Sequence, residues 1–424
     1  MRPRIPDLLR ERAFRRYWTG QSISLLGDEV HRIAMPLAAV LVLGADAADM
    51  GWLTAAPLLP ALFLSMPAGA WADGRRSRRR IMLAADVGRF LALASIPAAY
   101  ALGVLTLTQL FVVAFVIGIL SVLFNVSNNT LYASLVPTGS LLQGSSLING
   151  SRSIAFVAGP GAGGALVQVL TAPVALLADA VSYLASAFFL GRINPQEPPP
   201  APRERGHFLA GLRWVVGTPL IRAFQLGVAT LNFFNFIFHA LFVLYATREL
   251  GLAPGTLGLV LGAGAVGGLA GAALTGRIVA RLGYGVSIIA GCLGFSLPLV
   301  LVPLAHGSQP QIIAMLLAAE FLACFGVMVL DVSANAFQTA LVPDALRSRV
   351  SGVLQTVNYG IRPLGALAGG WLGTAIGLHA SLWIATVGAT LGVVWLLFSP
   401  LPGMRDLPAS AEPALSAATV GASA

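Results

Sequence analysis

The fold of this chain is decided by uncharged apolar stretches such as Leu110-Phe111-Val112-Val113-Ala114-Phe115-Val116-Ile117-Gly118-Ile119-Leu120-Ser121-Val122-Leu123-Phe124. A helix that crosses the roughly 30 Å hydrocarbon core of a membrane needs about 20 mostly apolar residues. The quoted stretch lies in an apolar run of that length, over 108–130, and similar runs recur along nearly the whole sequence. We therefore predict an all-α integral membrane protein.

The composition excludes a soluble globular protein. Of the 424 residues, 57% are hydrophobic and 10% are charged, whereas a soluble domain carries about 25% charged residues. The mean hydropathy is +0.81. The formal net charge of +9 comes from arginines, because the sequence contains no Lys. These arginines cluster between the apolar runs and form no basic stripe interleaved with aromatics, so no nucleic-acid partner is predicted.

Twelve membrane spans are predicted, in two sets of six. The sets are separated by Pro195-Gln196-Glu197-Pro198-Pro199-Pro200-Ala201-Pro202, which excludes a membrane helix. The predicted parts are an N-terminal tail (1–17), a six-helix bundle (18–192), a central loop (193–221), a second six-helix bundle (222–399) and a disordered tail (400–424). A short amphipathic helix is predicted from His207 to Val216. The spans are placed at 18–43, 50–72, 80–102, 108–130, 145–169, 174–192, 222–246, 254–276, 284–304, 310–331, 350–375 and 378–399.

The arginines sort to one side of the predicted membrane. They occupy the two tails, the central loop and the other even-numbered loops, whereas the odd-numbered loops contribute only Arg248. Cytoplasmic loops carry an excess of basic residues, so both termini are predicted to be cytoplasmic. Eleven apolar runs follow the first one, and we therefore expect no cleaved signal peptide.

The two halves of the chain repeat at an offset of 206 residues. Val126-Ser127-Asn128-Asn129 matches Val332-Ser333-Ala334-Asn335, Leu135-Val136-Pro137 matches Leu341-Val342-Pro343, and Gly159 with Gly163-Gly164 matches Gly365 with Gly369-Gly370. Parallel six-helix repeats form the architecture in which two halves alternate access to a site near the membrane midplane. The repeat favours a secondary transporter over a channel or a membrane enzyme.

The predicted loop between spans 2 and 3 combines a glycine, an acid and several arginines. It reads Gly69-Ala70-Trp71-Ala72-Asp73-Gly74-Arg75-Arg76-Ser77-Arg78-Arg79-Arg80. Glycine permits close helix approach, Asp is favourable at a helix N-terminus, and arginines pair with acids or lipid phosphate. The simplest interpretation is a topology anchor.

This loop resembles the Gly-x-x-x-Asp-…-Arg-Arg signature of the major facilitator superfamily, and the resemblance covers essentially the whole ordered chain. It implies the major facilitator fold, with two pseudo-symmetric six-helix bundles. It also implies that the loop latches the cytoplasmic side closed when the site faces outward. The sequence departs from the signature at Gly74, Arg76 and Ser77. The latch residues carried over are Gly69, Asp73, Arg75, Arg78 and Arg79.

Span 5 contains Gly159-Pro160-Gly161-Ala162-Gly163-Gly164, which resembles the Gly-Pro-x-x-Gly-Gly core of the antiporter motif in drug exporters of this superfamily. The antiporter-like residues are Gly159, Pro160, Gly163 and Gly164. Small residues allow close packing against the other half and proline bends a helix, although ordinary small-residue packing is the alternative. The segments 14–28 and 85–89 resemble the branch that contains macrolide exporters and the enterobactin exporter, which implies export.

Ionisable residues inside the spans are the candidate coupling site, because a charge in hydrocarbon costs several kcal/mol unless it is paired or hydrated. Asp28 and Glu320 lie near the middle of spans 1 and 10 and are predicted to bind protons or cargo. Arg32 and Arg362 are their predicted partners. A static Asp28–Arg32 pair, four residues apart, is the alternative. The full proton- or substrate-coupling set is Asp28, Glu29, Arg32, Arg152, Glu320 and Arg362.

Other polar residues in the spans are given different roles. Asp86 and Arg89 are predicted to form a structural pair, Asp179 to reach the outer interface, and Asp331 to act as a gate or cap. Asn232, Asn235 and His239 share one face of span 7 among several phenylalanines. This stripe predicts a pocket lining for bulky, partly apolar cargo, and helix–helix hydrogen bonding is the alternative.

The sequence lacks the signatures of several other protein classes. Without Lys there is no Gly-x-x-x-x-Gly-Lys phosphate loop, and no zinc-protease, Cys-x-x-Cys or nucleophile-elbow pattern occurs. Cys292 and Cys324 both lie in apolar segments. Neither an ATP-driven pump nor an enzyme is predicted, and no metal or cofactor.

The resulting functional prediction is a proton-coupled antiporter of the bacterial inner (cell) membrane. It exports drug-like or secondary-metabolite small molecules by alternating access; the alternative is proton-coupled uptake of a small polar solute. Its expected partners are the small-molecule substrate, protons and the lipid bilayer, and a monomer is expected.

Overall fold

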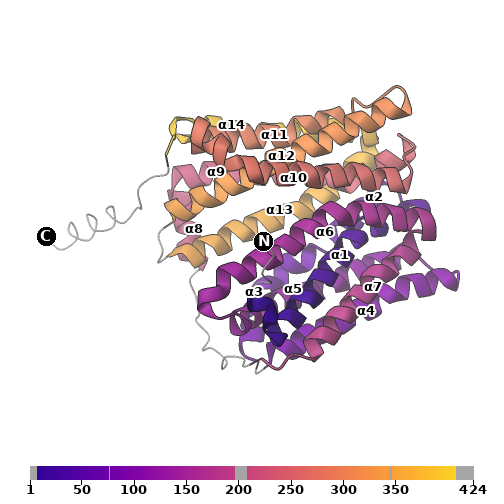
Figure 1. Ribbon diagram of the computed structural model, residues 1–424. Helices are drawn as coiled ribbons and strands as arrows, with labels where there is room; N and C mark the ends of the chain where they lie inside the picture. Colours follow the sequence, from indigo (N-terminus) through magenta and orange to yellow (C-terminus); the bar gives the residue numbers. More distant parts are fainter. Residues whose placement is uncertain (1–6, 76, 196–207, 343–345, 407–424) are drawn as a thin grey trace, which may run out of the picture. The chain divides into compact units, whose positions relative to one another are not determined.

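The computed structural model describes residues 7–75, 77–195, 208–342 and 346–406, and its regular secondary structure is helical throughout these ranges (Figure 1). The short 3-10 helices of the described residues are η1 (Asp7–Arg10), η2 (Thr138–Ser140), η3 (Pro298–Leu301) and η5 (Leu401–Gly403). The α-helices are α1 (Arg12–Leu41), α2 (Ala47–Ala55), α3 (Leu59–Asp73), α4 (Arg78–Ala101), α5 (Leu107–Leu135), α6 (Leu141–Leu170), α7 (Ala172–Gly191), α8 (Phe208–Gly217), α9 (Pro219–Arg248), α10 (Pro254–Leu282), α11 (Tyr284–Ser296), α12 (Gln309–Leu341), α13 (Arg347–Ile376) and α14 (Leu378–Leu397).

The predicted all-α membrane fold is confirmed. Within the described residues, 10 helical segments are long and apolar enough to cross a membrane. The predicted spans 1 and 11 correspond to α1 and α13, which have 30 residues each but fall outside that set. Both helices carry ionisable candidates, Asp28 in α1 and Arg362 in α13. Both of these helices thus combine an apolar run with polar candidates for transport.

Two predicted spans are interrupted by proline. The turn Ala56–Leu58 divides span 2 into α2 and α3, with Pro57 in the turn and Pro60 in the first turn of α3. Span 9 is α11 followed by η3, which begins at Pro298. Proline has no backbone N–H to donate and its ring obstructs the preceding helical turn, so a regular helix ends there. After the central loop, α8 lies where the short amphipathic helix is predicted.

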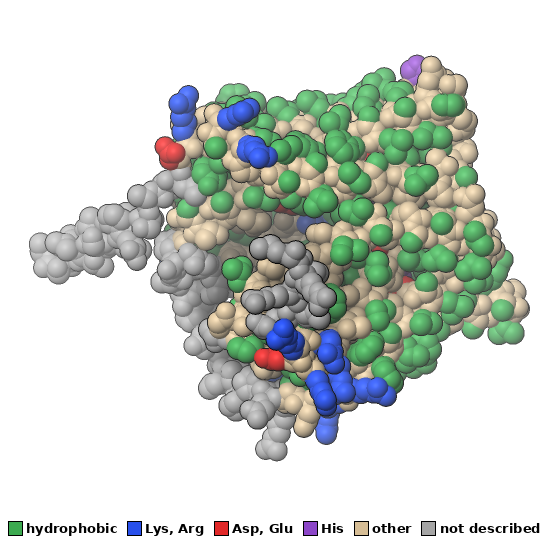
Figure 2. Space-filling view, viewed as in Figure 1, with side chains coloured by type: hydrophobic (Ala, Val, Ile, Leu, Met, Phe, Trp, Pro, Cys, Tyr) green, Lys and Arg blue, Asp and Glu red, His purple; other side chains and the backbone are tan. Residues whose placement is uncertain are grey.

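The described chain divides into two compact units. The first comprises residues 1–204, 239–262 and 366–378, and the second comprises 205–238, 263–365 and 379–424, so that α9, α10 and α13 contribute to both. Phe14, Met82 and Leu131 are among the buried core residues of the first unit, and Phe224 and Phe337 among those of the second. On the face shown in Figure 2, the arginines of each unit gather at one end of its helices, whose sides are largely hydrophobic.

In the first unit, helices cross at paired glycines. A Cβ atom on Gly164 of α6 would lie 2.6 Å from the Pro254 carbonyl oxygen and 2.9 Å from the Gly258 Cα of α10. A Cβ on Gly51 of α2 would lie 2.8 Å from the Gly370 Cα of α13. Gly164 and Gly370 are equivalent in the 206-residue repeat. The chain therefore builds the same close crossing twice, and only glycine permits this approach.

Two side chains of the first unit join helix ends opposite the arginine-rich loops. Arg248 Nη2 donates a 2.8 Å hydrogen bond to the carbonyl oxygen of Gly44, whose φ of 67° reverses the chain after α1. Gln168 Oε1 of α6 accepts a 3.0 Å bond from the N–H of Gly255 in the first turn of α10. The second contact satisfies an N–H that the start of a helix leaves without an intrahelical partner, and the first satisfies a carbonyl group of the turn after α1. These arginine-poor ends are thus held by polar bonds as well as by glycine packing.

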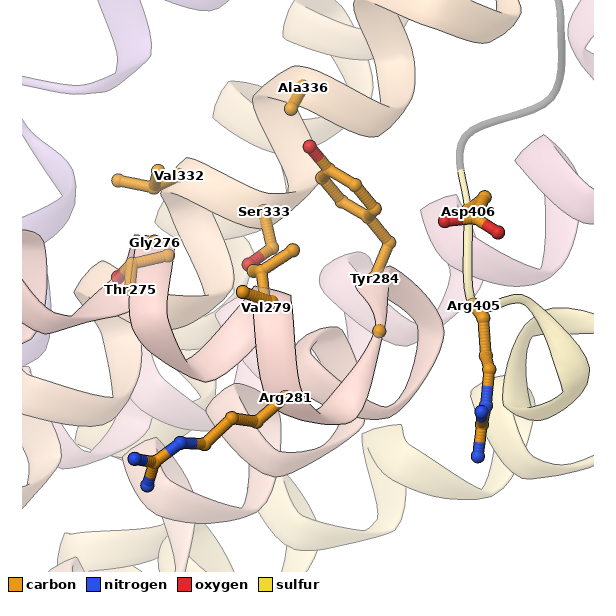
Figure 3. A pocket seen from close by; sticks show the side chains of 12 residues that line it. Thr275, Gly276, Val279, Arg281, Tyr284, Val332, Ser333, Ala336, Arg405 and Asp406 are labelled. Carbon is orange, nitrogen blue, oxygen red and sulfur yellow. The ribbon is translucent and has the colours of Figure 1, made fainter.

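In the second unit, the segment after α14 binds the start of α11. The N–H groups of Tyr284 and Gly285 donate to the carbonyl oxygens of Arg405 (3.1 Å) and Met404 (2.9 Å), and Leu401 is fully buried. Arg405 and Asp406 also line a cavity of about 590 Å³ with residues of α10, α11 and α12. Figure 3 shows the Arg405 side chain extending away from the Tyr284 hydroxyl. We call residues 401–406 the C-terminal clasp.

In the first unit, a side chain of α4 binds the end of α7, and these two helices correspond to α11 and α14 in the repeat. Arg79, near the start of α4, donates from Nε to the carbonyl oxygen of Leu190 at 2.8 Å and from Nη2 to that of Gly191, at the end of α7. Cations are favourable at the C-terminal end of a helix, where carbonyl groups lack partners. Leu190 corresponds to Leu396 of α14 in the repeat. In the first half of the chain, the guanidinium of Arg79 therefore links α4 to the end of α7. In the second half, backbone groups of the C-terminal clasp link the segment after α14 to α11.

We expect Gly285→Ala to destabilise the protein by about 1–3 kcal/mol, because overpacking of a close contact costs this much. The added Cβ would clash with the Leu401 carbonyl oxygen and lie 3.1 Å from that of Met404. Thermal unfolding of the purified full chain in detergent measures the change. The matched control is Gly403→Ala in the same clasp, where the added Cβ would have no atom within 4 Å. Equal unfolding temperatures for the two variants would contradict the prediction.

Candidate functional site

Polar side chains of α1, α4 and α7 meet inside the first unit. Figure 1 shows α7 beside α4 and α1, and α7 packs against both of these helices. The contributing faces follow helical spacing, since residues at i, i+3, i+4 and i+7 share one face. We call this group the acidic cluster: Gly27, Asp28 and His31 of α1, Asp86 and Arg89 of α4, and Asp179, Ser182, Tyr183 and Ser186 of α7.

Asp28 binds a tyrosine in the acidic cluster. The hydroxyl group of Tyr183, a residue that is 2% exposed, donates a 2.7 Å hydrogen bond to Asp28 Oδ1. The predicted partner, Arg32, instead forms its ion pair with Glu29 at 3.1 Å. The predicted Asp28–Arg32 pair is therefore wrong for this conformation. A neutral hydroxyl that donates to a carboxyl group leaves that group free to take up and release a proton.

Arg32 lies outside the acidic cluster. Its side chain is 58% exposed, whereas that of Glu29 is 15% exposed and packs against Gly159 of α6. Exposed ion pairs stabilise proteins by roughly 0–1 kcal/mol. We expect Arg32→Gln to change the unfolding temperature and the transport rate little, as thermal unfolding in detergent and flux in proteoliposomes would measure. Complete loss of transport would show that Arg32 acts in a state different from this one.

Asp86 and Arg89 form a buried ion pair within α4, at 0% and 5% exposure. The Arg89 guanidinium lies 4.3 Å from the centre of the Tyr183 ring and 4.4 Å from that of Phe124, which are cation–π distances. The pair predicted as structural therefore belongs to the same cluster as Asp28. Because Arg89 forms its direct ion pair with Asp86, it interacts with the carboxylate of Asp28 only at longer range.

Asp179 is fully buried, although the sequence places it at the outer interface. Its Oδ1 accepts a 3.0 Å hydrogen bond from Ser182, and its Oδ2 lies 3.2 Å from His31 Nδ1. A Cβ on Gly27 would lie 2.5 Å from Asp179 Oδ1 and would also clash with the Ser182 hydroxyl group. Glycine at position 27 thus creates the space in which the Asp179 carboxylate meets α1.

The candidates of α12 and α13 belong to the second unit. Glu320 is 9% exposed and lies close to Gly264 of α10, where an added Cβ would be 3.3 Å from Glu320 Oε2. Arg362, its predicted partner, binds the side-chain oxygen of Asn358 through Nε at 3.1 Å and Nη2 at 2.9 Å. It also lies over the rings of Tyr359 (4.7 Å) and Phe236 (5.4 Å), and it interacts electrostatically with Asp331. Arg362 is therefore held by an amide and two rings, and Asp331 acts on it only at longer range.

The three polar residues predicted to line a pocket on α9 differ in burial and in hydrogen bonding. Asn232 donates to the Val228 carbonyl oxygen of its own helix at 2.9 Å, Asn235 is 8% exposed, and His239 is exposed. Asn232 and Asn235 belong to the second unit and His239 to the first. Arg152 in α6 is exposed and interacts electrostatically with Tyr17.

The latch candidates are described only in part. Arg75 lies over the Trp71 ring at 4.8 Å, Arg78 is buried, and Arg79 binds α7 as given above. The surroundings of Gly69 and the side chain of Asp73 lie outside the described residues, as do residues 407–424 of the predicted tail. In the antiporter-like segment, Gly163 packs against the backbone of Val30 and Gly164 against that of Gly258. The segment therefore contacts both α1 and α10.

Sequence reasoning missed Tyr183, His31 and the role of Asp179. A signal for them was present, because Asp179, Ser182, Tyr183 and Ser186 have the spacing of one helix face. The same spacing holds for Gly27, Asp28 and His31 in α1. However, the sequence does not show that α1 packs against α7. That packing, which belongs to the tertiary structure, brings the two polar faces together into one cluster.

Comparison with known proteins gives consistent results. The family described as "Transmembrane secretion effector" matches residues 6–421. An uncharacterised major-facilitator-type transporter of Bacillus subtilis, YfiS, is 29% identical over 89% of this chain and 90% of its own length. The multidrug efflux pump Tap of Mycolicibacterium fortuitum is 26% identical over 91% of this chain and 95% of its own.

Solved structures match the fold. A bacterial homologue of the iron transporter ferroportin, in an inward-facing state, has a TM-score of 0.76 at 18% identity, over 91% of this chain and 98% of its own. The nucleoside transporter NupG has a TM-score of 0.73 at 14% identity, over 91% and 97% of the two chains. At these identities the likeness concerns the arrangement of helices alone.

Proposed function

Because the chain belongs to the transmembrane secretion effector family of major facilitator transporters, we propose that it is a proton-coupled antiporter that exports drug-like or secondary-metabolite small molecules. It is a multi-pass membrane transporter and not an enzyme. Two half-bundles, over 18–192 and 222–399, alternate access in this proposal, with both termini in the cytoplasm of a bacterial cell.

The observation that carries proton coupling is the charge balance of the acidic cluster. Asp28, Asp86 and Asp179 are three carboxylates, and among the described residues Arg89 is the guanidinium that interacts with Asp28 and Asp86. Uncompensated charge inside a membrane protein costs several kcal/mol, so such a cluster favours proton uptake. Asp28 is the carrier in this proposal, because its hydrogen-bond donor is the neutral Tyr183 and not a cation.

Export is supported by the relatives named as multidrug efflux pumps and by the glycine packing of α6 against α1 and α10. In the antiport cycle, proton binding from the outside and cargo binding from the cytoplasm alternate, and each favours release of the other. Uptake of a small polar solute with protons is the competing function, and it predicts flux in the same direction as the protons.

The experiment is transport in proteoliposomes with an imposed pH gradient. The probes are the lipophilic dye ethidium and the anthracycline doxorubicin, read by fluorescence. An antiporter accumulates a probe in an acidic lumen and loses it when the gradient is collapsed with an ionophore; protein-free liposomes correct for passive trapping. Accumulation in an alkaline lumen would establish symport instead, and protein-dependent flux that ignores the gradient would refute proton coupling.

A further inference from the structure

His31 and Asp179 face each other inside the acidic cluster without a completed hydrogen bond. His31 Nδ1 and Asp179 Oδ2 are 3.2 Å apart, and among the described residues neither atom has a hydrogen-bond partner. A buried polar atom without a partner is costly, and in native structures such an atom points to a missing ion, water or proton. Within the described residues no group of three His, Cys, Asp or Glu is placed to hold a metal ion.

We infer that the His31–Asp179 pair is a second proton-binding site, which takes one proton in addition to the one carried by Asp28. This inference rests on the proposed proton coupling and deepens it. The proton resides on the imidazole ring and makes His31 a cation, whose Nδ1–H then donates to Asp179 Oδ2. Asp179 remains a carboxylate, because Ser182 already donates to its other oxygen.

Charge balance requires a second proton. With Asp86 compensated by Arg89, the ionised forms of Asp28 and Asp179 leave two negative charges in the cluster. One proton on Asp28 removes one of them, and an imidazolium at His31 offsets the other. The doubly protonated cluster is neutral overall, which is the state that a low-dielectric interior favours.

The two side chains of the pair differ in their exposure to solvent. The Asp179 side chain is fully buried, whereas that of His31 is 20% exposed. His31 is therefore the member of the pair that exchanges protons with water. The space between the two exists because residue 27 is glycine, which leaves room for Asp179 Oδ1 at 2.5 Å from where a Cβ would stand.

The other charged groups around α1 either pair with different residues or lie far from His31 and Asp179. Glu29 and Arg32 form their own pair, and α2 contributes Asp49, which is held in a capping box with Asp46. Arg152 of α6 and Tyr132 of α5 lie near Tyr17, a position 14 residues before His31 and thus roughly 21 Å away along the helix. Among the described residues, the titratable groups that interact with the pair are Asp28, Asp86 and Tyr183, and Arg89 interacts with all three of them.

Nitrogen NMR of the full chain, labelled with ¹⁵N-histidine in nanodiscs, tests the site without any cargo. His31→Asn assigns the signal and keeps an N–H donor near the Nδ1 position; if it folds poorly, His31→Gln assigns the signal instead, with its amide nearer the Nε2 position. We expect the His31 ring to change from imidazolium to a neutral tautomer between mildly acidic and mildly alkaline pH, also in Asp28→Asn. A ring that stays neutral throughout would overturn the inference.

A second readout counts the protons. A pH jump applied to proteoliposomes on a solid-supported membrane displaces charge as protons bind. We expect Asp28→Asn and His31→Asn each to retain part of the wild-type charge and the double variant to retain almost none. An unchanged signal in His31→Asn overturns the second site while leaving proton coupling intact. Cargo flux that is independent of pH in the wild type refutes the proposed function, whereas a titrating His31 would still establish the site.

Discussion

Asp28→Asn is expected to reduce pH-driven accumulation strongly while cargo-for-cargo exchange continues. The asparagine keeps the volume of the side chain and an oxygen that accepts from Tyr183, but it cannot take up a proton. Coupling between two ligands of a transporter amounts to roughly 1–3 kcal/mol, and about 1.4 kcal/mol corresponds to a factor of ten. Accumulation driven by an imposed gradient should therefore fall by roughly 5- to 150-fold.

The measurement compares two fluxes in the same proteoliposomes. The first is probe accumulation under a pH gradient, and the second is exchange of labelled for unlabelled probe with no gradient. Asp406→Asn is the matched control, because it is the same substitution at the C-terminal clasp, outside the acidic cluster. Gradient-driven accumulation at the wild-type level in Asp28→Asn would remove Asp28 from the coupling mechanism.

Most of the fold follows from local properties of the sequence. The spans are predicted because each is a run of apolar residues, and the breaks at Pro57 and Pro298 reflect a donor that proline lacks. The 206-residue repeat is visible in the glycines of the sequence, and the structure explains why glycine occurs at these positions. Gly164 and Gly370 each occupy a helix crossing where a side chain would meet the neighbouring backbone.

The partners within the site do not follow from local properties. Arg32 lies four residues after Asp28, the spacing of a helical ion pair, yet its guanidinium turns to Glu29 on the exposed side. The hydrogen-bond donor to Asp28 is Tyr183, 155 positions away in sequence. Periodicity identifies which face of a helix is polar, whereas the choice between neighbouring helices depends on packing over the whole bundle. The polar stripes of α1 and α7 are each weak signals, and only their contact makes them a site.

Gly164→Val is expected to open the arginine-poor end of the crossing between α6 and α10 and to abolish transport. The first added carbon would lie 2.6 Å from the Pro254 carbonyl oxygen and 2.9 Å from the Gly258 Cα. These are backbone atoms, so the helices must separate, because no side chain can rotate away. Overpacking costs about 1–3 kcal/mol, which shifts a two-state equilibrium by roughly 5- to 150-fold. A transporter that must re-form this crossing in every cycle would then stay open at this end.

The opening can be measured by labelling a buried position near the crossing. Leu252, between α9 and α10, is 5% exposed. Leu252→Cys, in a chain whose Cys292 and Cys324 are replaced by Ala, should react slowly with a membrane-impermeant maleimide. Adding Gly164→Val should accelerate the reaction roughly tenfold, in line with the population shift. The control is Gly161→Val, because it is the same substitution one turn earlier on α6, at a position where an added Cβ has no atom within 4 Å. Equal labelling and equal transport in the two valine variants would show that the glycine crossing does not control the arginine-poor end.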